Sequence, residues 1–406
     1  MTETFASRIS VPRALELLRA AAGARPPATE TVPTRRADGR VLAADVVAPV
    51  ALPAFDNSAM DGFAVRHADL AGAAPVTLEL AGEQFAGPDL ALAVGAGQCV
   101  RITTGAPMPA GADAVVIRED AVERDGWVQV PAGVRAGAHV RRRAEDVAPG
   151  DVVLHAGQVL SAARIGLAAA LGIDRLDVAA RPTVAVFTSG DELAEPGVPL
   201  QPGQVYNSNR EQLMAQLRAA GLEPVAWPTL PDDPARIAAV LDDAVDNFDL
   251  VLTCGAVSAG QKDHLPDWLR ARGRIHFWKV RMRPGMPLLF GEAGRALVLC
   301  LPGNPVSVLA TFHVFGRALV DALQGRAERR RWQARLAAPW TKRHDRLEFL
   351  RGRLDQDPDD ATLQVHPVPA DGSHRLRGAA HSDVLIVLDE GARAYAAGDR
   401  VEVLPL

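Results

Sequence analysis

The sequence is poor in cysteine and aromatic residues, has no excess of basic charge, and lacks a long apolar run. Its three cysteines are scattered and match no zinc or disulfide spacing, which argues against a disulfide-stapled fold. The net charge of −5, with no basic tail or stripe, argues against a nucleic-acid partner. Without a membrane-length apolar run or a signal-peptide core, we expect no membrane partner and a reducing, cytoplasmic location.

The chain does contain ample apolar sequence for a folded core. Its 406 residues are 48% apolar and 23% charged, which is typical of soluble globular proteins. This length exceeds what one ordinary hydrophobic core organises. We therefore expect two to four domains.

The most informative stretch is Ala296–Val308. An apolar run stops at Pro302–Pro305, and apolar residues then recur at helical spacing as far as Leu323. This pattern predicts a buried strand that leads into a helix, with Pro305 at the first helical position. The free N–H groups and the positive end of the helix dipole would then face outward where the strand ends, which favours an anion.

The chain before residue 181 combines two patterns. We expect helices at Val11–Ala22 and Ala162–Leu171, and a strand over Arg40–Val50. From Val76 to about Val153, short alternating runs broken by Gly and Pro indicate a small β-rich domain. Residues 1–50 and 147–180 should thus form an elongated α+β N-terminal linker domain, into which a β-rich domain of residues 51–146 is inserted.

Strand and helix patterns alternate between residues 181 and 327. Strands are predicted at Thr183–Phe187, Glu223–Trp227, Asp249–Cys254 and Ile275–Val280, and Ser208–Glu211 is typical of a capping box that opens a helix. This alternation predicts a doubly wound αβα domain, in which a mostly parallel sheet is covered by helices on both faces. Ligands in such folds bind outside the carboxyl ends of the strands.

The alternation stops near residue 328. Val365–Pro369, Val384–Leu388 and Arg400–Val403 have the composition of strands. Residues 328–406 should therefore form a small, barrel-like β domain that closes the chain.

Three turns at predicted strand ends converge on one cleft: Thr188–Gly197, Thr253–His264 and Leu301–Ser307. Their Gly and Ser residues let backbone N–H groups approach a phosphate closely. Four carboxylates accompany them, and phosphate cradles beside carboxylates suggest a magnesium ion that bridges acid side chains to a phosphorylated ligand. These carboxylates are Glu192, Asp232, Asp233 and Asp263.

Each of these residues also has a simpler interpretation. Asp233 is a helix cap before Pro234 whatever else it does, and Glu192 can simply be solvated. Cys254 and Cys300 fit small buried hydrophobes better than reactive thiols. The histidines show no ligand spacing, so we assign none of them to a metal.

A basic row precedes the last of the three turns. Lys279, Arg281 and Arg283 alternate along the sequence, so on one strand their side chains would leave the same face. Such a row beside phosphate-binding turns could hold an oxyanion or a diphosphate. The simpler interpretation is a solvated strand face.

These motifs together resemble the molybdopterin molybdenumtransferase family, which includes bacterial MoeA, the plant molybdenum insertase and the E domain of gephyrin. The resemblance rests on PAFDNSAMDGFAV, RITTGAPMPAGADAVV, TSGDEL, GAVSAGQKD and CLPGNPVSV, and covers essentially the whole chain. It implies a homodimer with four domains per chain, the central one similar to MoaB and Mog. It also implies an Mg²⁺-dependent reaction that inserts molybdate into adenylylated molybdopterin and releases AMP.

The resemblance also carries functional positions over to this chain. The catalytic positions it implies are Asp56, Thr104, Asp146, Glu192, Asp233 (or Asp232), Asp263 and Arg283, with Glu192 and Asp263 as the metal ligands. The substrate-binding positions are Ser189, Gly190, Asp191, Gly255, Val257, Ser258, Gly260, Lys279, Arg281, Pro302, Gly303, Asn304, Pro305, Ser307, Arg351 and Ser373. Magnesium and cations would neutralise charge at a crowded diphosphate, as in other phosphoryl transfers.

Three departures from the family pattern bear on activity. Ala256 stands where the family usually has a glycine, Met286 where it has a lysine, and Arg377-Gly378 where it has a serine pair. Alanine tolerates a left-handed backbone poorly, so the first change can alter its turn. We hypothesise that Arg281 compensates for the cation lost at Met286.

Two functions remain open at this point. One is the molybdenum-inserting enzyme. The other is a catalytically altered paralogue that binds molybdopterin or the finished cofactor and delivers it to molybdoenzymes. Because the chain holds one pterin-binding αβ domain, a separate molybdopterin adenylyltransferase is an expected partner. Molybdoenzymes or their chaperones are further candidate partners.

Overall fold

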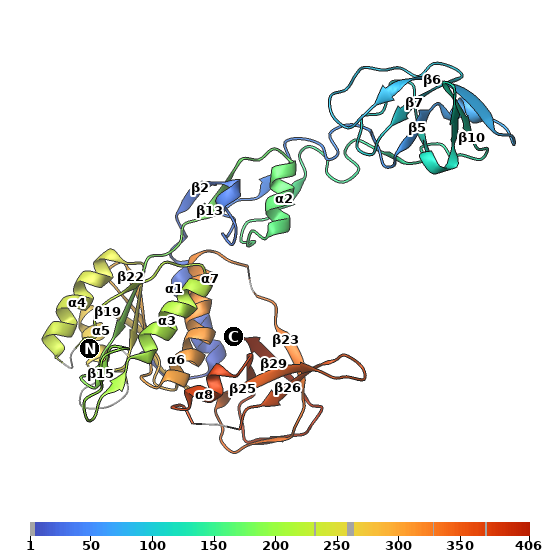
Figure 1. Cartoon of the computed structure of the whole chain (residues 1–406). Coiled ribbons are helices and arrows are strands. Elements are labelled where there is room, and N and C mark those ends of the chain that lie inside the picture. The colour runs from blue at the N-terminus through green and yellow to red at the C-terminus, as the bar shows by residue number, and fades with distance from the viewer. Residues whose placement is uncertain (1–4, 231–232, 258–263, 328, 370–371) are drawn as a thin grey trace.

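The chain has four parts arranged along an elongated path (Figure 1). A computed structural model describes residues 5–230, 233–257, 264–327, 329–369 and 372–406. One end of the molecule is a β-rich part, a slim connecting part follows, and the other end holds an αβα part beside a β-barrel. The predicted multidomain α/β architecture is confirmed.

The centre of the αβα part is a seven-stranded sheet in the order β1-β19-β21-β22-β18-β14-β17. Among the described residues, β21 alone of these seven strands runs antiparallel to its neighbours, so the expected mostly parallel sheet is confirmed. The strands are β1 (Ala6–Ile9), β19 (Gly273–Val280), β21 (Leu289–Ala293), β22 (Ala296–Leu301), β18 (Leu250–Cys254), β14 (Val184–Thr188) and β17 (Val225–Ala226).

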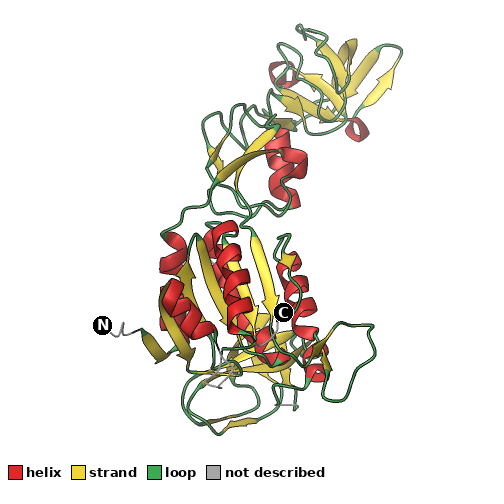
Figure 2. Cartoon of the chain, turned by 90° about the vertical axis from the view of Figure 1, so that its left-hand side faces the viewer, coloured by secondary structure: helices red, strands yellow, loops and turns green. Residues whose placement is uncertain are grey.

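Helices cover both faces of this sheet (Figure 2). One face packs against α1 (Val11–Gly23), α3 (Ser208–Ala219), α6 (Pro305–Thr311), a π-helical turn (Phe312–Gly316) and α7 (Arg317–Leu323). The other face packs against α4 (Pro234–Asn247) and α5 (Leu265–Arg272). Strand β22 is buried at all six positions because it lies between both helix layers.

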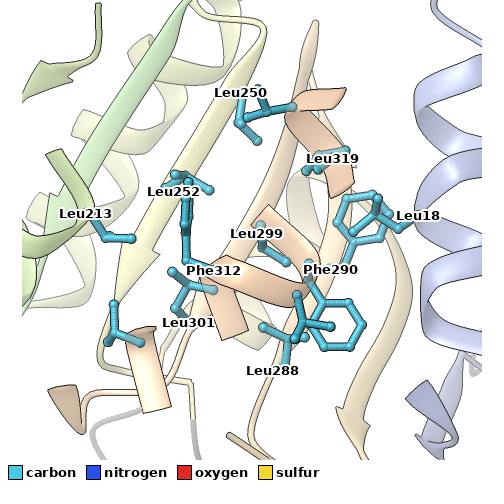
Figure 3. Packing of buried hydrophobic residues seen from close by; sticks show 14 of the residues in the cluster. Leu18, Leu213, Leu250, Leu252, Leu288, Phe290, Leu299, Leu301, Phe312 and Leu319 are labelled. Carbon is cyan, nitrogen blue, oxygen red and sulfur yellow. The ribbon is translucent and has the colours of Figure 1, made fainter. Parts of the chain in front are cut away.

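Large aliphatic and aromatic side chains interlock on the first of these faces. Figure 3 shows Leu252 and Leu299 from the sheet beside Phe312, with Leu213 and Leu18 reaching in from α3 and α1. The helical run Pro305–Leu323 is the one stretch of the described residues that is long and apolar enough to cross a membrane, and 67% of it is buried. The sequence interpretation found no run approaching that length.

The start of the chain differs from its predicted assignment. Strand β1 pairs with β19 in the central sheet, and α1 packs into the central core against α7. The prediction placed these residues in the linker domain because the expected helix at Val11–Ala22 carries no sign of its packing partner. The helix itself is confirmed.

The connecting part is held by short strand pairs. Arg40–Val50 is not one strand, since only Val46–Val47 is extended within a pair and Val41 and Leu42 form isolated bridges. The elements are β2 (Thr29–Pro33) with β13 (Arg175–Ala179), β3 (Val46–Val47) with β12 (Val152–Leu154), and α2 (Ala162–Ala170), with a 3₁₀ turn at Thr34–Arg36.

The β-rich part is a six-stranded sheet in the order β8-β5-β7-β6-β10-β9. These strands are β8 (Ala114–Ile117), β5 (Gly62–Val65), β7 (Gln98–Ile102), β6 (Val76–Gln84), β10 (Trp127–Val130) and β9 (Val122–Arg124). A separate pair, β4 (Asn57–Ser58) with β11 (Val140–Arg141), holds its entry and exit together, and 3₁₀ turns lie at His67–Leu70 and Arg118–Asp120.

The last part is a closed five-stranded barrel in the order β25-β26-β23-β29-β27, with β27 returning to β25. The elements are β23 (Trp332–Leu336), β25 (Leu347–Gln356), β26 (Leu363–Pro367), α8 (Leu376–Ala380), β27 (Val384–Leu388) and β29 (Arg400–Pro405), with β24 (Trp340–Lys342) paired to β28 (Arg393–Tyr395).

The barrel and the αβα part share a core and a strand pairing. Strand β20 (Met282–Arg283) leaves the central sheet and pairs with β25. Phe349 and Leu385 of the barrel pack into the same cluster as the central helices. This continuity fixes the barrel against the carboxyl-terminal end of β22.

Candidate functional site

The described residues of the three predicted turns lie side by side at the carboxyl ends of β14, β18 and β22. The Ser189 N–H donates to the Cys254 carbonyl (3.1 Å), and the Gly255 N–H donates to the Leu301 carbonyl (3.2 Å). These bonds continue the parallel pairing of the strands one step into the turns. The turns therefore form one rigid rim, as the sequence predicted.

Glycine is required where these turns touch. A Cβ on Gly255 would lie 3.0 Å from the Ser189 carbonyl oxygen. Gly255 has φ +94° and Ala256 φ +49°, so both residues adopt the left-handed region. The turn therefore keeps a left-handed backbone at Ala256 despite the strain that a Cβ brings there.

Two buried asparagines that the sequence interpretation missed hold the turns in place. Asn207 donates through Nδ2 to the hydroxyls of Thr188 (2.8 Å) and Thr229 (3.1 Å). Asn209 donates to the Gly303 carbonyl (2.7 Å). Both asparagines are less than a tenth exposed, so each fixes a turn from beneath.

The predicted capping box at the start of α3 is wrong. Asn207 is the cap, because its side-chain oxygen accepts from the Arg210 N–H. Ser208 is already the first helical residue. The sequence did contain a warning of this error. Asn207, Ser208 and Asn209 are all common cap residues, so the residue at which the helix begins is ambiguous.

The barrel contributes Ser373 to the β22 turn. The Val306 N–H donates to the Ser373 carbonyl (3.2 Å), and Asn304 donates through Nδ2 to the Ser373 hydroxyl (3.0 Å). Nearby, buried Arg351 of β25 donates to the Arg375 carbonyl (2.9 Å). The structure thus brings Ser373, Asn304 and the neighbouring Pro302–Ser307 turn together, although Ser373 lies about 70 residues away in the sequence.

The three predicted basic residues do not share one strand face. Lys279 has φ +69° and lies over the Trp278 ring, with its Nζ 4.5 Å from the ring centroid. Arg281 follows the end of β19 and approaches carboxylates of the barrel, and Arg283 belongs to β20, in the barrel sheet. The left-handed backbone at Lys279 changes the direction of the chain near the end of β19, and that change cannot be read from the alternation of charges.

The same bend keeps Lys279 beside the β18 turn. The Trp278 Nε1–H donates to the Val257 carbonyl (3.1 Å), which ties the ring to the second turn. Arg283 lies 3.7 Å from the buried Glu348 carboxylate of the barrel. Lys279 is therefore near the turns, whereas Arg281 and Arg283 approach carboxylates of the C-terminal part.

Of the two predicted turn carboxylates that the structure describes, Glu192 and Asp233, Glu192 fits a ligand-facing role better. It is exposed, and its oxygens lie against Gly190, where a Cβ would meet Oε2 at 2.5 Å. Asp191 is exposed beside it. Asp233 accepts from the Ala235 N–H (2.9 Å) and caps α4, which confirms its simpler interpretation as a cap.

Several predicted positions lie outside the described residues: Asp232, Ser258, Gly260 and Asp263. Within the described residues, no group of three or more His, Cys, Asp or Glu side chains is arranged to hold a metal ion. Mg²⁺ does not need such a cage, because it retains waters and binds one or two carboxylates together with substrate phosphates. The exposed carboxylate of Glu192 at a glycine turn fits that mode.

The cysteines at the strand ends are buried. Burial raises the pKa of the Cys300 thiol to about 12 and the pKa of Cys254 further still. Thiols with such raised pKa values stay protonated and unreactive at neutral pH. The interpretation of both residues as buried hydrophobes is confirmed.

The remaining predicted positions lie in the β-rich part, far from the turns in the same chain (Figure 1). Asp56 accepts from the Arg143 N–H (2.7 Å) and from the Arg142 guanidinium (2.8 Å). Both hydrogen bonds hold the pKa of Asp56 below its usual value, and the bond from the Arg143 N–H has the larger effect. Asp146 is exposed, and its N–H donates to the carbonyl of Leu52, four residues before Asp56 (3.1 Å).

Thr104 has a partner, Asp61, that is not among the predicted functional positions. Its N–H (2.7 Å) and its hydroxyl (2.8 Å) both donate to Asp61, which lowers the pKa of that carboxylate. The Gly105 N–H donates to the Ser58 carbonyl (2.8 Å). The two motifs of the β-rich part therefore form one locked loop pair.

Comparisons with known proteins match this architecture part by part. The family model of the MoeA N-terminal region (domains I and II) matches residues 9–172. The model described as "Probable molybdopterin binding domain" matches residues 185–322, and the model of the MoeA C-terminal region (domain IV) matches residues 333–406.

Full-length relatives decide the family. Molybdopterin molybdenumtransferase 2 of Mycobacterium tuberculosis is 42% identical over 387 residues, which cover 93% of this chain and 95% of the relative. Molybdopterin molybdenumtransferase of Haemophilus influenzae is 36% identical, with 94% of each chain covered. The chain belongs to the molybdopterin molybdenumtransferase family. The family predicted from the five sequence motifs is confirmed.

A solved structure of similar shape supports the fold of this family member. The molybdopterin biosynthesis MoeA protein of Pyrococcus horikoshii OT3 aligns with a TM-score of 0.85 and 27% identity, covering 98% of this chain and 100% of that one. The four-part arrangement is therefore the family's fold.

Proposed function

We propose that this chain is a molybdopterin molybdenumtransferase that inserts molybdate into adenylylated molybdopterin and releases AMP. The observation that carries the proposal is the rim of three turns at the ends of β14, β18 and β22, joined to Ser373 of the barrel. This rim lies where open αβ sheets bind ligands, and glycine-containing turns of this kind can present backbone N–H groups to an anion. The names of the full-length relatives support the same activity.

The residues of this chain would act mainly by binding and by neutralising charge. Backbone N–H groups of the glycine turns would bind the diphosphate, and Lys279 would place its ammonium group beside it. When bound, Mg²⁺ would offset negative charge on the phosphate oxygens, with Glu192 and Asp263 as its protein ligands. Asn304 would stay oriented by Ser373, so that its side chain does not block the turn.

We further propose a homodimer whose sites each use two chains. Within one chain, the connecting part separates the αβα part from the β-rich part, to which Asp56 and Thr104 belong (Figure 1). Both are held by local hydrogen bonds, as expected of loops that are preorganised for a ligand. A two-fold arrangement would let the loops of one chain complete the rim of the other.

The carrier alternative receives less support. The full-length relatives are named as transferases, and the departure at Ala256 leaves a left-handed turn in place. The enzyme would act in the cytoplasm and receive its substrate from a separate molybdopterin adenylyltransferase. It would then supply molybdoenzymes or their chaperones.

The test is AMP release from adenylylated molybdopterin by the purified full-length chain, with Mg²⁺ and molybdate added or withheld. We expect release that requires Mg²⁺ and a molybdenum-containing product that requires molybdate. Binding of the substrate without AMP release under every condition would support the carrier. Absence of both binding and release in a folded preparation would overturn both functions.

A further inference from the structure

A pocket of about 710 Å³ opens on the outer surface of the C-terminal part, beside α8. Its walls come from β25, from the end of β26 and from the segment that runs from His374 through α8. In Figure 1, α8 lies at the junction between the barrel and α6. Neither the three turns nor the loops of the β-rich part belong to this lining.

Six of the eleven residues that line the pocket are arginine or histidine, around a surface that is otherwise mostly apolar. The basic residues that line it are Arg353, Arg375, Arg377, His366, His374 and His381. They come from separate segments and converge on one hollow, and none of the lining residues that the structure describes is acidic. The three arginines among them carry like charges that repel each other, so their convergence favours an anionic ligand.

The arginines of this basic pocket are available for a ligand. Arg353, Arg375 and Arg377 are exposed, and within the described parts of the chain none of their side chains forms an ion pair. The backbone beneath them is fixed, since the Arg375 carbonyl accepts from buried Arg351. Arg377 is also one of the positions where the sequence departs from the family pattern.

The volume of the basic pocket and its apolar wall limit the kind of ligand that can bind there. A free tetrahedral oxyanion would fill only a small part of 710 Å³, whereas typical small-molecule sites measure about 300–1,000 Å³. Pro367, Val368, Pro369 and Leu376 supply an apolar wall beside the guanidinium groups. Guanidinium groups bind phosphates through paired donors and also stack on planar rings.

We propose that the basic pocket binds an organic phosphate with a planar ring, of the size of a nucleoside monophosphate. The phosphate would lie between Arg353 and Arg377, and the ring would pack on the Pro367–Pro369 wall. This site is separate from the proposed active site. The pocket residue His374 directly follows Ser373, and Ser373 contacts the β22 turn. A ligand bound in the basic pocket could therefore affect the β22 turn through Ser373.

Isothermal titration of the full-length chain, without Mg²⁺ or molybdopterin, tests the proposal with three probes: AMP, adenosine and inorganic phosphate. The titrations are made in the Lys279→Ala background, because loss of the cation beside the strand-end rim should weaken AMP binding there and leave the basic pocket unchanged. We expect AMP to bind at least tenfold more tightly than either adenosine or phosphate. The double variant Arg353→Ala/Arg377→Ala should weaken AMP binding at least tenfold.

Arg343→Ala is the matched control, because Arg343 is an exposed arginine of the same C-terminal part outside the pocket. Its AMP affinity should equal that of the parent chain, and thermal melting should show all variants folded. Equal binding of phosphate and AMP would overturn the organic-phosphate assignment. Tighter binding of hexaglutamate than of AMP, lost in the double variant, would overturn it in favour of an acidic protein segment. If the double variant left AMP binding unchanged, the basic pocket would be excluded as the AMP-binding site.

Discussion

The strand-end turns and the loops of the β-rich part use carboxylates in opposite ways. In the turns, Glu192 is exposed against Gly190, and within the described residues its carboxylate has no hydrogen-bond partner. In the β-rich part, Asp56 and Asp61 each accept hydrogen bonds from local donors. A carboxylate whose lone pairs are already occupied shapes a loop, whereas a carboxylate open to solvent can bind a ligand.

This difference assigns different roles to residues of the same type. Buried amides and strand pairing hold the turns from beneath, which leaves their upper side for a ligand. In the loops of the β-rich part, the acidic side chains instead form hydrogen bonds within the loops and so stabilise the loop conformation. We therefore expect substitutions of Glu192 to act on turnover, and substitutions around Asp56 to act on loop order as well as on turnover.

The largest effect should come from Glu192→Gln. The substitution keeps shape but removes the charge that would hold Mg²⁺, so turnover should fall at least about 100-fold. Because Glu192 is exposed, stability should change by less than about 0.5 kcal/mol. AMP release and thermal melting measure the two quantities.

Glu195→Gln is the matched control for that variant. Glu195 lies on the same segment, but its carboxylate pairs with Arg210, which lowers its pKa. Its turnover should stay near that of the parent chain. Comparable losses in both variants would mean that the segment, and not the Glu192 charge, matters.

The second prediction tests whether the two regions meet between chains. An Asp56→Ala chain and a Glu192→Gln chain should each be inactive. After subunit exchange in an equal mixture, half of the dimers would be mixed, with one intact site of two, so about a quarter of the activity should return. No recovery despite proven exchange would place both residues in the site of one chain.

The third prediction concerns the support beneath the turns. Asn207→Ala removes the cap of α3 and two buried hydrogen bonds, so it should destabilise the chain by about 2–3 kcal/mol. Ser208→Ala is the matched control and should cost less than about 0.5 kcal/mol. Denaturant titration would distinguish them, and a larger cost at Ser208 would restore the predicted capping box.

A smaller effect follows from the lowered pKa of Asp56. A carboxylate with a depressed folded-state pKa stabilises the fold above its unfolded pKa and loses that contribution as the pH falls through the folded value. The gap in melting temperature between the parent chain and Asp56→Asn should thus be present at pH 7 and close below about pH 4. Because Asp56 is 38% exposed, the gap should correspond to less than about 1 kcal/mol. A gap of equal size at pH 7 and pH 3 would contradict this linkage.

The sequence predicted the central fold well because its signals are local. Apolar runs that end in Gly and Pro mark β14, β18 and β22, and each of these strands stands within a residue or two of its expected bounds. Strand β1 was assigned to the wrong part because its pairing with β19 joins residues about 270 apart. Such pairings leave no local pattern.

The candidate site was predictable to the same extent. The three turns could be found from composition, whereas the hydrogen bonds of Asn207 and Asn209 depend on which turn lies above them. The prediction that the three basic residues share one strand face was wrong for a related reason. The left-handed backbone of Lys279 turns the chain between residues that alternate in sequence, so a period of two no longer implies one face.

The smallest effect should come from Arg281, where the sequence suggested compensation for Met286. Its guanidinium lies 3.5 Å from Asp345 and 3.4 Å from Glu390, both in the barrel, and its side chain is 43% exposed. Exposed ion pairs of this kind contribute about 0–1 kcal/mol, so Arg281→Ala should change the molybdate concentration needed for half-maximal turnover less than threefold. Met286→Lys alone should then improve molybdate use, because it adds a cation that Arg281 does not replace. Compensation predicts the opposite: at least a tenfold higher molybdate requirement in Arg281→Ala and recovery only when Met286→Lys is added. Molybdate titrations of the two single variants and the double variant would decide whether Arg281 serves the barrel contact or the substrate.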